Sequence, residues 1–198
     1  MIYSLNSIEV PPLAQVGGKA KALIETTLAG FNVPAGFILA VDFFQDLVEQ
    51  VKSTDAWRAF LQEPSREACT ALQERARELR LTPEQRAVLE GQLSQMPSQA
   101  AYAVRSSSPE EDLAQTSFAG QYETILGVAP AGLEQSIARA FSSMLDYRVV
   151  EYKRQNNLPL DRPRIAIIVQ EQLKSDVSGV AFSLNPMNNA FDEAVINA

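Results

Sequence analysis

The segment Gly17-Gly18-Lys19 holds the first residues that could do chemistry, and an apolar helical pattern follows it directly. Glycine lets the backbone approach a bulky anion closely, and the first turn of a helix offers unpaired amides at the positive end of its dipole. Lys19 would add a full positive charge there, so the segment could hold a phosphate group. Taken alone it also fits an ordinary turn, because the spaced glycines and the Lys-Ser or Lys-Thr pair of a Walker motif are absent.

A second cation, Arg105, ends a short apolar run and is followed by three serines, residues 106–108. An arginine in this position can make forked contacts with phosphate oxygens, while hydroxyl groups and amides complete the coordination. The structural alternative is a helix start with Ser108 as N-cap, Pro109 in the first turn and Glu111 closing a capping box. The two interpretations are compatible, but capping gives no reason for an arginine at the strand end.

Residues 115–124 form a loop of small residues around Phe118 and lead into an apolar run. Such a loop can close over a triphosphate, with Gly120 allowing close backbone contact and Thr124 offering a hydroxyl group. The alternative interpretation is a plain approach to a hairpin.

A third cation, Arg148, falls on the apolar stripe of a long helix predicted over residues 130–156. A charge on the buried side of a helix needs a partner. That partner could be a structural carboxylate or a nucleotide phosphate.

The polar residue Gln170 directly follows the continuous apolar run of residues 165–169. A strand that ends this way can serve as a hinge between two lobes and hydrogen-bond the edge of an adenine. The alternative is a core strand that leaves its sheet.

Apolar periodicity and turn residues predict the elements that must position these groups. Helices are expected at residues 20–29, 41–51 and 130–156, with two or three more between residues 55 and 95, and strands at 37–40, 101–106, 122–128, 165–169, 177–184 and 192–198. The last strand has no turn or polar tail after it, so the sequence is expected to be cut from a longer chain.

The absence of histidine and a net charge of −7 over 198 residues narrow the chemistry further. Without histidine the chain lacks the commonest general base, the Ser-His-Asp and Cys-His nucleophile arrangements and most zinc sites. The negative charge disfavours nucleic acid and anionic membranes as partners, and the apolar runs are too short to span a bilayer. Cys69 is the only cysteine, and the N-terminus does not read as a secretory signal, so the cytoplasm is the expected compartment.

Seven segments, in this order, resemble the N-terminal ATP-binding domain shared by phosphoenolpyruvate synthase, pyruvate phosphate dikinase and rifampicin phosphotransferase. They are residues 16–23, 33–37, 103–108, 111–113, 116–126, 147–152 and 178–186. The resemblance implies an α+β, ATP-grasp-like fold that holds the nucleotide between two lobes and is incomplete at its C-terminal end. We expect an N-terminal subdomain at residues 1–100, which includes a helical insertion, and a mixed strand and helix subdomain of the same ATP-binding domain at 101–198.

The resemblance also implies roles for individual residues. Lys19 and Arg105 would contact the phosphates as catalytic and binding residues, and Gln170 would lie near the adenine. Gly120 and Thr124 would belong to the closing loop, and Arg148 matches an arginine of the family's long helix. Magnesium is expected to accompany ATP with ligands beyond Ala198, so no metal ligand is assigned within this sequence.

In the family, the β-phosphate of ATP passes to a carrier histidine on a separate domain and then to pyruvate, while the γ-phosphate goes to water. The resemblance therefore implies an ATP-dependent phosphotransferase of the dikinase type whose present piece is inactive alone. Within the same chemistry, the acceptor could be an antibiotic such as rifampicin, or a glucan. A non-catalytic nucleotide-binding module is the alternative from a different class.

Overall fold

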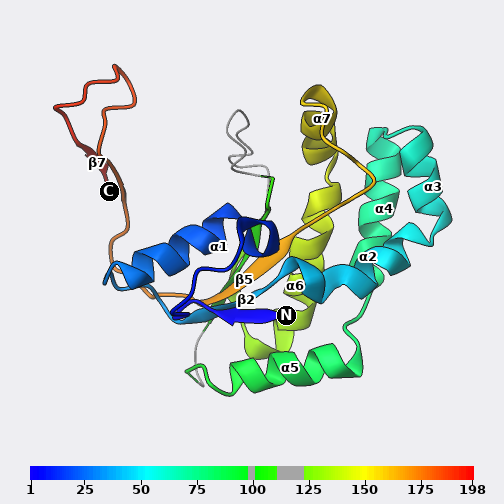
Figure 1. Cartoon of the computed structure of the whole chain (residues 1–198), viewed down its shortest axis with the longest axis horizontal. Helices are drawn as coiled ribbons and strands as arrows, with labels where there is room; N and C mark the ends of the chain where they lie inside the picture. Colours follow the sequence, from blue (N-terminus) through cyan, green and yellow to red (C-terminus); the bar gives the residue numbers. More distant parts are fainter. Residues whose placement is uncertain (98–100, 111–122) are drawn as a thin grey trace.

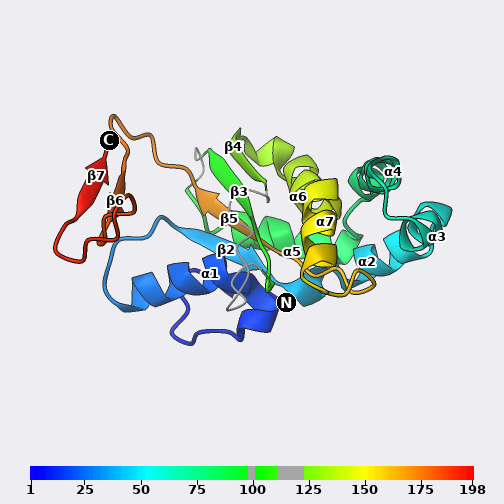
Figure 2. The ribbon, with the colours of Figure 1, turned by 90° about the horizontal axis from the view of Figure 1, so that it is seen from above.

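The computed structural model describes residues 1–97, 101–110 and 123–198. In that part of the chain, an antiparallel sheet of five strands in the order β1-β2-β5-β3-β4 lies at the centre, with helices on both faces (Figures 1 and 2). Its strands are β1 (Ile2–Ser4), β2 (Gly36–Leu39), β3 (Tyr102–Ser107), β4 (Thr124–Val128) and β5 (Ala166–Glu171). The mixture of helices and sheet confirms the predicted α+β class. Both expected subdomains contribute strands to this sheet.

The two faces of the sheet bury different sets of side chains. Helix α1 (Leu13–Leu28) covers one face, where Val16, Ala20 and Ile24 pack against Ile38 and Ile168. The other face carries the larger core under η1 (Val41–Phe44), α2 (Gln45–Lys52), α6 (Leu133–Ser142) and α7 (Tyr147–Gln155). Strand β5 is buried on both faces because it is central, which explains why its apolar run shows no alternation.

The segment predicted to hold two or three helices forms α3 (Asp55–Gln62), α4 (Arg66–Glu78) and α5 (Pro83–Leu93). Their starts follow local rules: Thr54 and Ser65 cap α3 and α4, and Thr82 opens a capping box with Gln85 on α5. Buried side chains such as Trp57 belong to the same core as the sheet. The helical segment is therefore an integral part of the larger core.

The single long helix predicted over residues 130–156 is wrong. The chain forms a turn η2 (Pro130–Gly132), then α6, a second turn η3 (Ser143–Leu145) and finally α7. The hydroxyl groups of Ser142 and Ser143 donate back to carbonyls of α6, and Asp146 leaves the helical conformation at φ −59° and ψ 138°. The Asp146 carboxylate then accepts from the Arg148 amide, so a new helix begins.

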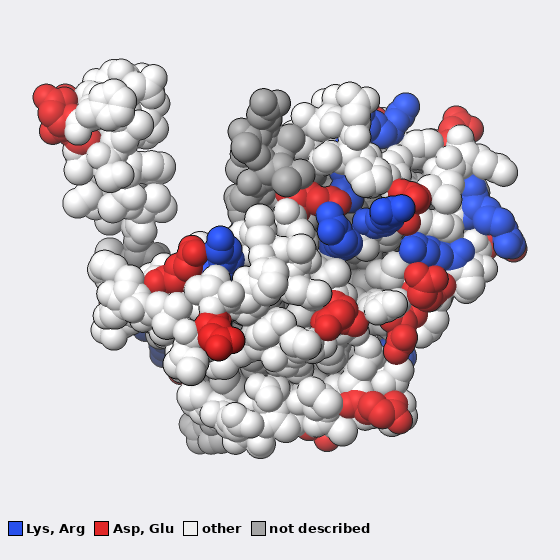
Figure 3. Space-filling view, viewed as in Figure 1, with Lys and Arg blue, Asp and Glu red and all other residues white. Residues whose placement is uncertain are grey.

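Two short strands, β6 (Val180–Phe182) and β7 (Val195–Asn197), pair as a hairpin that stands apart from the central sheet (Figures 1 and 2). The hairpin and its loop expose apolar side chains, with Met187 and Phe191 each 90% exposed. Figure 3 shows the hairpin as a largely uncharged lobe, whereas most Lys and Arg atoms in that view lie over the helical half. Among the described residues, no helix is both long and apolar enough to cross a membrane.

The thiol of Cys69 is buried in the larger core, and this burial, reinforced by the negative charge of Asp146, raises its pKa to about 11. Since the thiolate is the reactive form, we expect the folded protein to resist a disulfide reagent at about pH 8. Unfolding in guanidinium should release one reactive thiol per chain, and glutathione serves as the exposed reference. Rapid labelling of the folded protein would contradict the buried position.

Candidate functional site

Helix α1 consists of two helical pieces joined at Gly17, whose backbone angles are φ 74° and ψ 168°. Residues with a side chain rarely adopt this conformation, so the junction requires glycine. A fresh helix therefore begins directly after Gly17, with Lys19 half-buried in its first turn. The predicted glycine-led helix start is confirmed, although four further helical residues precede it.

The beginning of this second helical piece lies against the end of β3. The Ala20 amide donates to the Ser107 hydroxyl over 3.2 Å. A Cβ atom placed on Gly17 would lie 2.6 Å from the carbonyl carbon and oxygen of Ser107, closer than real contacts allow. The two segments singled out in the sequence, Gly17-Gly18-Lys19 and Arg105 to Ser108, thus meet although nearly ninety positions separate them.

The pairing of the strands places the other predicted residues on the same face as this contact. Arg105 of β3 is opposite Thr124 of β4 and Ile168 of β5, and Ser107 is two residues further along β3. Because side chains alternate along a strand, Arg105, Ser107 and Thr124 share the face that α1 covers. Gln170 shares that face because it pairs with Ala103.

One hydrogen bond connects Arg105 to Gln170, and a second connects Gln170 to the backbone. The Arg105 guanidinium donates to the Gln170 side-chain oxygen over 3.3 Å, and the Gln170 amide donates to the Pro34 carbonyl over 3.2 Å. Gln170 is buried and Arg105 is half-buried. The guanidinium is thus oriented by a buried neighbour and keeps donors for an anion.

Arg148 does not lie where the sequence pattern put it. Its side chain is 66% exposed and binds Asp146 over 3.0 Å, so the prediction of a buried cation at this position is wrong. The break at Asp146 restarts the helix, and the buried positions of α7 become Val149, Val150 and Lys153. Burial alone would raise the pKa of Asp146, but hydrogen bonds and charge from Arg148, with the charge of Arg66, hold it below its usual range.

The cation that α7 does bury is Lys153, which the sequence pattern missed. Its ammonium group lies 2.5 Å from Glu110, and the two side chains are 4% and 3% exposed. Arg164 lies 3.8 Å from the other Glu110 oxygen. The Glu110 amide also donates to Ser108, so this ion pair anchors the chain that follows the three serines. Starting the helix at residue 147 would have put Lys153 on the apolar stripe with Val149 and Val150.

Two further expectations depend on residues that the structure does not describe. Gly120 and Glu111 lie outside the described residues, so the closing loop and the capping box remain predictions. Residues 109–110 form a turn. In residues 1–97, 101–110 and 123–198, no group of three or more Asp, Glu or Cys side chains is placed to hold a metal ion.

Replacing Gly17 tests the contact with Ser107. We expect Gly17→Ala to lower the free energy of unfolding by at least about 2 kcal/mol, because the methyl group collides with the Ser107 backbone and the backbone angle is strained. Gly30→Ala is the matched control, since Gly30 has φ 86° but open space around it. Equal losses in the two variants, measured by urea denaturation, would show that the collision does not matter.

Replacing Lys153 tests the buried ion pair. We expect Lys153→Met to lower the free energy of unfolding by about 3 to 5 kcal/mol, because it leaves the Glu110 charge buried beside a single distant cation. Adding Glu110→Leu should recover most of the loss. The control Lys52→Met removes an exposed pair with Glu49 and should cost less than about 1 kcal/mol. A similar small loss at Lys153 would refute the anchoring role.

Known proteins resemble the chain over its whole length. The family model described as pyruvate phosphate dikinase, AMP/ATP-binding domain, matches residues 13–198. A rifampicin phosphotransferase of Streptomyces sviceus is 33% identical over 100% of this chain and 24% of its own length. A probable phosphoenolpyruvate synthase of Methanocaldococcus jannaschii is 29% identical over 92% of this chain and 16% of its own. A phosphoenolpyruvate synthase of Aeropyrum pernix is 28% identical over 100% of this chain and 26% of its own length.

This chain spans about a quarter or less of the length of these relatives. The match of the family model confirms the resemblance found in the ordered motifs. The chain belongs to the pyruvate phosphate dikinase AMP/ATP-binding domain family.

Proposed function

We propose that this chain binds magnesium-ATP as the nucleotide-binding part of a phosphoenolpyruvate synthase-like phosphotransferase, a pyruvate, water dikinase. One observation carries the proposal: the glycine-led helix start and the serine end of β3 touch at Gly17 and Ser107. That contact gathers amides, hydroxyl groups and cations from two distant segments on one face of the sheet. The family match to an ATP-binding domain supports the same ligand.

The donor set suits a polyphosphate. The start of a helix favours an anion through its dipole, and Lys19 adds charge in the turn after Gly17, where the Ala20 amide already donates to Ser107. Arg105, oriented by Gln170, supplies planar donors for phosphate oxygens. Thr124 is exposed on the same face and would join Gly120 in closing over the phosphates.

We place the adenine beside Gln170, at the end of β5. The strand leads from the buried centre of the sheet to the hairpin, so it fits a hinge between two lobes of an ATP-grasp-like domain. The exposed apolar side chains of the β6–β7 hairpin support a second lobe that packs there. Arg148 is on α7, which packs in the layer opposite α1, so it lies apart from the other described members of the proposed set.

In the proposed reaction, positioning and charge neutralisation do most of the work. Lys19 and Arg105 would offset the negative charge on the phosphoryl group as it is transferred. Such charge neutralisation is the main requirement of phosphoryl transfer. Magnesium would contribute further charge, held by ligands outside the described residues. The phosphoryl group would pass to a carrier histidine on another domain, because this sequence contains no histidine. We therefore propose that the chain alone does not turn over.

A rifampicin phosphotransferase is the second candidate for the parent activity. It is favoured by a specific observation: the relative from Streptomyces sviceus is 33% identical to this chain over an alignment that covers the whole chain and 24% of the relative. ATP binding is common to both candidates, so the residues described above are unaffected by the choice. The acceptor is what differs between them.

The test is calorimetric titration of magnesium-ATP into a chain extended through the complete domain of its relatives. We expect Lys19→Ala and Arg105→Ala each to weaken binding by about 1 to 3 kcal/mol, because each removes a charge-assisted hydrogen bond. Arg148→Ala should have a smaller effect, since its guanidinium is exposed and already bound to Asp146.

Lys21→Ala is the matched control on the same helix, because Lys21 is exposed and lies 3.6 Å from Glu25. It should bind ATP like the unaltered chain. Equal affinity in Lys19→Ala, Arg105→Ala and the control would remove both cations from the site and end the nucleotide assignment.

A further inference from the structure

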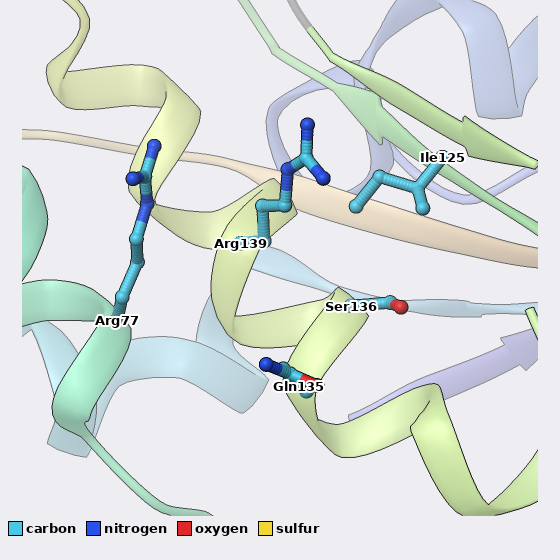
Figure 4. Close-up of a pocket in the computed structure, with 5 residues that line it drawn as sticks. All are labelled: Arg77, Ile125, Gln135, Ser136 and Arg139. Atoms are coloured by element: carbon cyan, nitrogen blue, oxygen red, sulfur yellow. The ribbon is translucent and has the colours of Figure 1, made fainter.

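A hollow of about 430 Å³ opens on the opposite face of the sheet from α1, between α4, α6 and β4 (Figure 4). It is lined by Arg77, Ile125, Gln135, Ser136 and Arg139. Its volume is in the range of small-molecule sites, and its lining combines several polar side chains with the apolar Ile125. Arg77 comes from α4 and Arg139 from α6, and in that view Arg139 lies between Arg77 and Ile125.

The position on the opposite face follows from the strand pairing. Ile125 of β4 is opposite Val104, which belongs to the larger core, whereas its neighbour Thr124 is opposite Arg105. Adjacent residues of a strand point to opposite faces. The hollow is therefore separated from the proposed nucleotide site by the thickness of the sheet.

Charge at the hollow is positive. Arg77 donates through its Nε atom to the Ser142 hydroxyl over 3.1 Å and has no carboxylate partner among the described residues. Two nearby carboxylates are already occupied, because Glu78 pairs with Arg75 and Glu134 pairs with Arg86. Arg77 is exposed, so its positive charge is accessible to an anion in the hollow.

The second arginine, Arg139, has one competitor for an incoming anion. Its guanidinium pairs with the Glu123 carboxylate, and both side chains are partly open to solvent. An exposed ion pair of this kind is worth only about 0 to 1 kcal/mol. A ligand with two negative charges that reaches both arginines can therefore displace Glu123.

We propose that this hollow binds a small oxyanion, specifically the phosphate group of a compact phosphomonoester. The Arg77 and Arg139 guanidinium groups would hold the phosphate between them, with the Gln135 amide and the Ser136 hydroxyl as neutral partners. Ile125 provides the apolar wall for the organic part of the ligand. The phosphate could also be free inorganic phosphate, which shares the same contacts.

The experiment is a titration of inorganic phosphate and of phenyl phosphate, followed by the amide signals of residues 135–139 and the Nε–H signals of the arginines. We expect both probes to shift these signals, with phenyl phosphate binding at least threefold more tightly if an organic ester is the natural ligand. Equal affinities would assign the site to free phosphate.

Substitutions of the arginines and of Glu123 should change phosphate affinity in opposite directions. Arg77→Gln and Arg139→Gln should each weaken binding at least fivefold, whereas Glu123→Gln should strengthen it, because it removes the competing carboxylate. Arg75→Gln, on the same face of α4 as its partner Glu78, is the control and should leave binding unchanged. The amide spectrum of each variant reports whether it is folded.

Two results would overturn the proposal. One is the absence of shifts at residues 135–139, and the other is a response that persists in the Arg77→Gln and Arg139→Gln double variant. Arg105→Gln separates this proposal from the nucleotide assignment, since it should leave these signals responsive while removing phosphate effects at residues 18–20.

Discussion

The close approach of Gly17 to Ser107 is the constraint on which the described site depends. A Cβ atom at residue 17 would enter the space of the Ser107 backbone, and the positive φ there excludes most other residues. Helix α1 can hold this position because Val16, Ala20 and Ile24 are fully buried against β2 and β5. The packing of one helix face thus sets the distance between the helix start and the end of β3. The chemistry proposed for Lys19 and Arg105 depends on that distance.

The layer that contains α7 also stabilises the end of β3, from the face of the sheet opposite α1. Glu110 continues the chain after the serines and is held by Lys153 from α7 and Arg164 from the segment before β5. A buried pair of this kind is costly to desolvate and contributes little net stability, so its value lies in fixing one geometry. The buried ion pair and α1 therefore restrain residues 105–110 from two sides. A polyphosphate site needs such restraint, because its donors must already point at the anion before it arrives.

Local sequence rules predicted most elements but not the contacts between them. Strand β5 and helices α3 to α5 were predictable, because apolar runs, capping serines and threonines and a proline at a helix start act within a few residues. The break at Asp146 was missed because the apolar stripe continues across it, while Ser142 and Ser143 favour local bonds to carbonyls. Because of that error, the sequence predicted Arg148 as the buried cation, whereas the structure buries Lys153. The bond between Ala20 and Ser107 spans 87 positions, and no periodicity encodes it; only the family resemblance had assigned the two segments to the same phosphates.

Glu123, the residue before β4, makes contacts toward both proposed sites. The Glu123 carbonyl accepts hydrogen bonds from the Ser106 amide over 3.2 Å and the Ser106 hydroxyl over 2.9 Å, next to Arg105. The side chain of the same residue pairs with Arg139 at the hollow. Glu123 is therefore the one described residue that contacts both the strand carrying Arg105 and an arginine of the hollow. Since linkage is reciprocal, a nucleotide could weaken anion binding at the hollow only by the same factor by which the anion weakened nucleotide binding. Any coupling between the two proposed sites would have to pass through this residue, because the sites share no ligand atom.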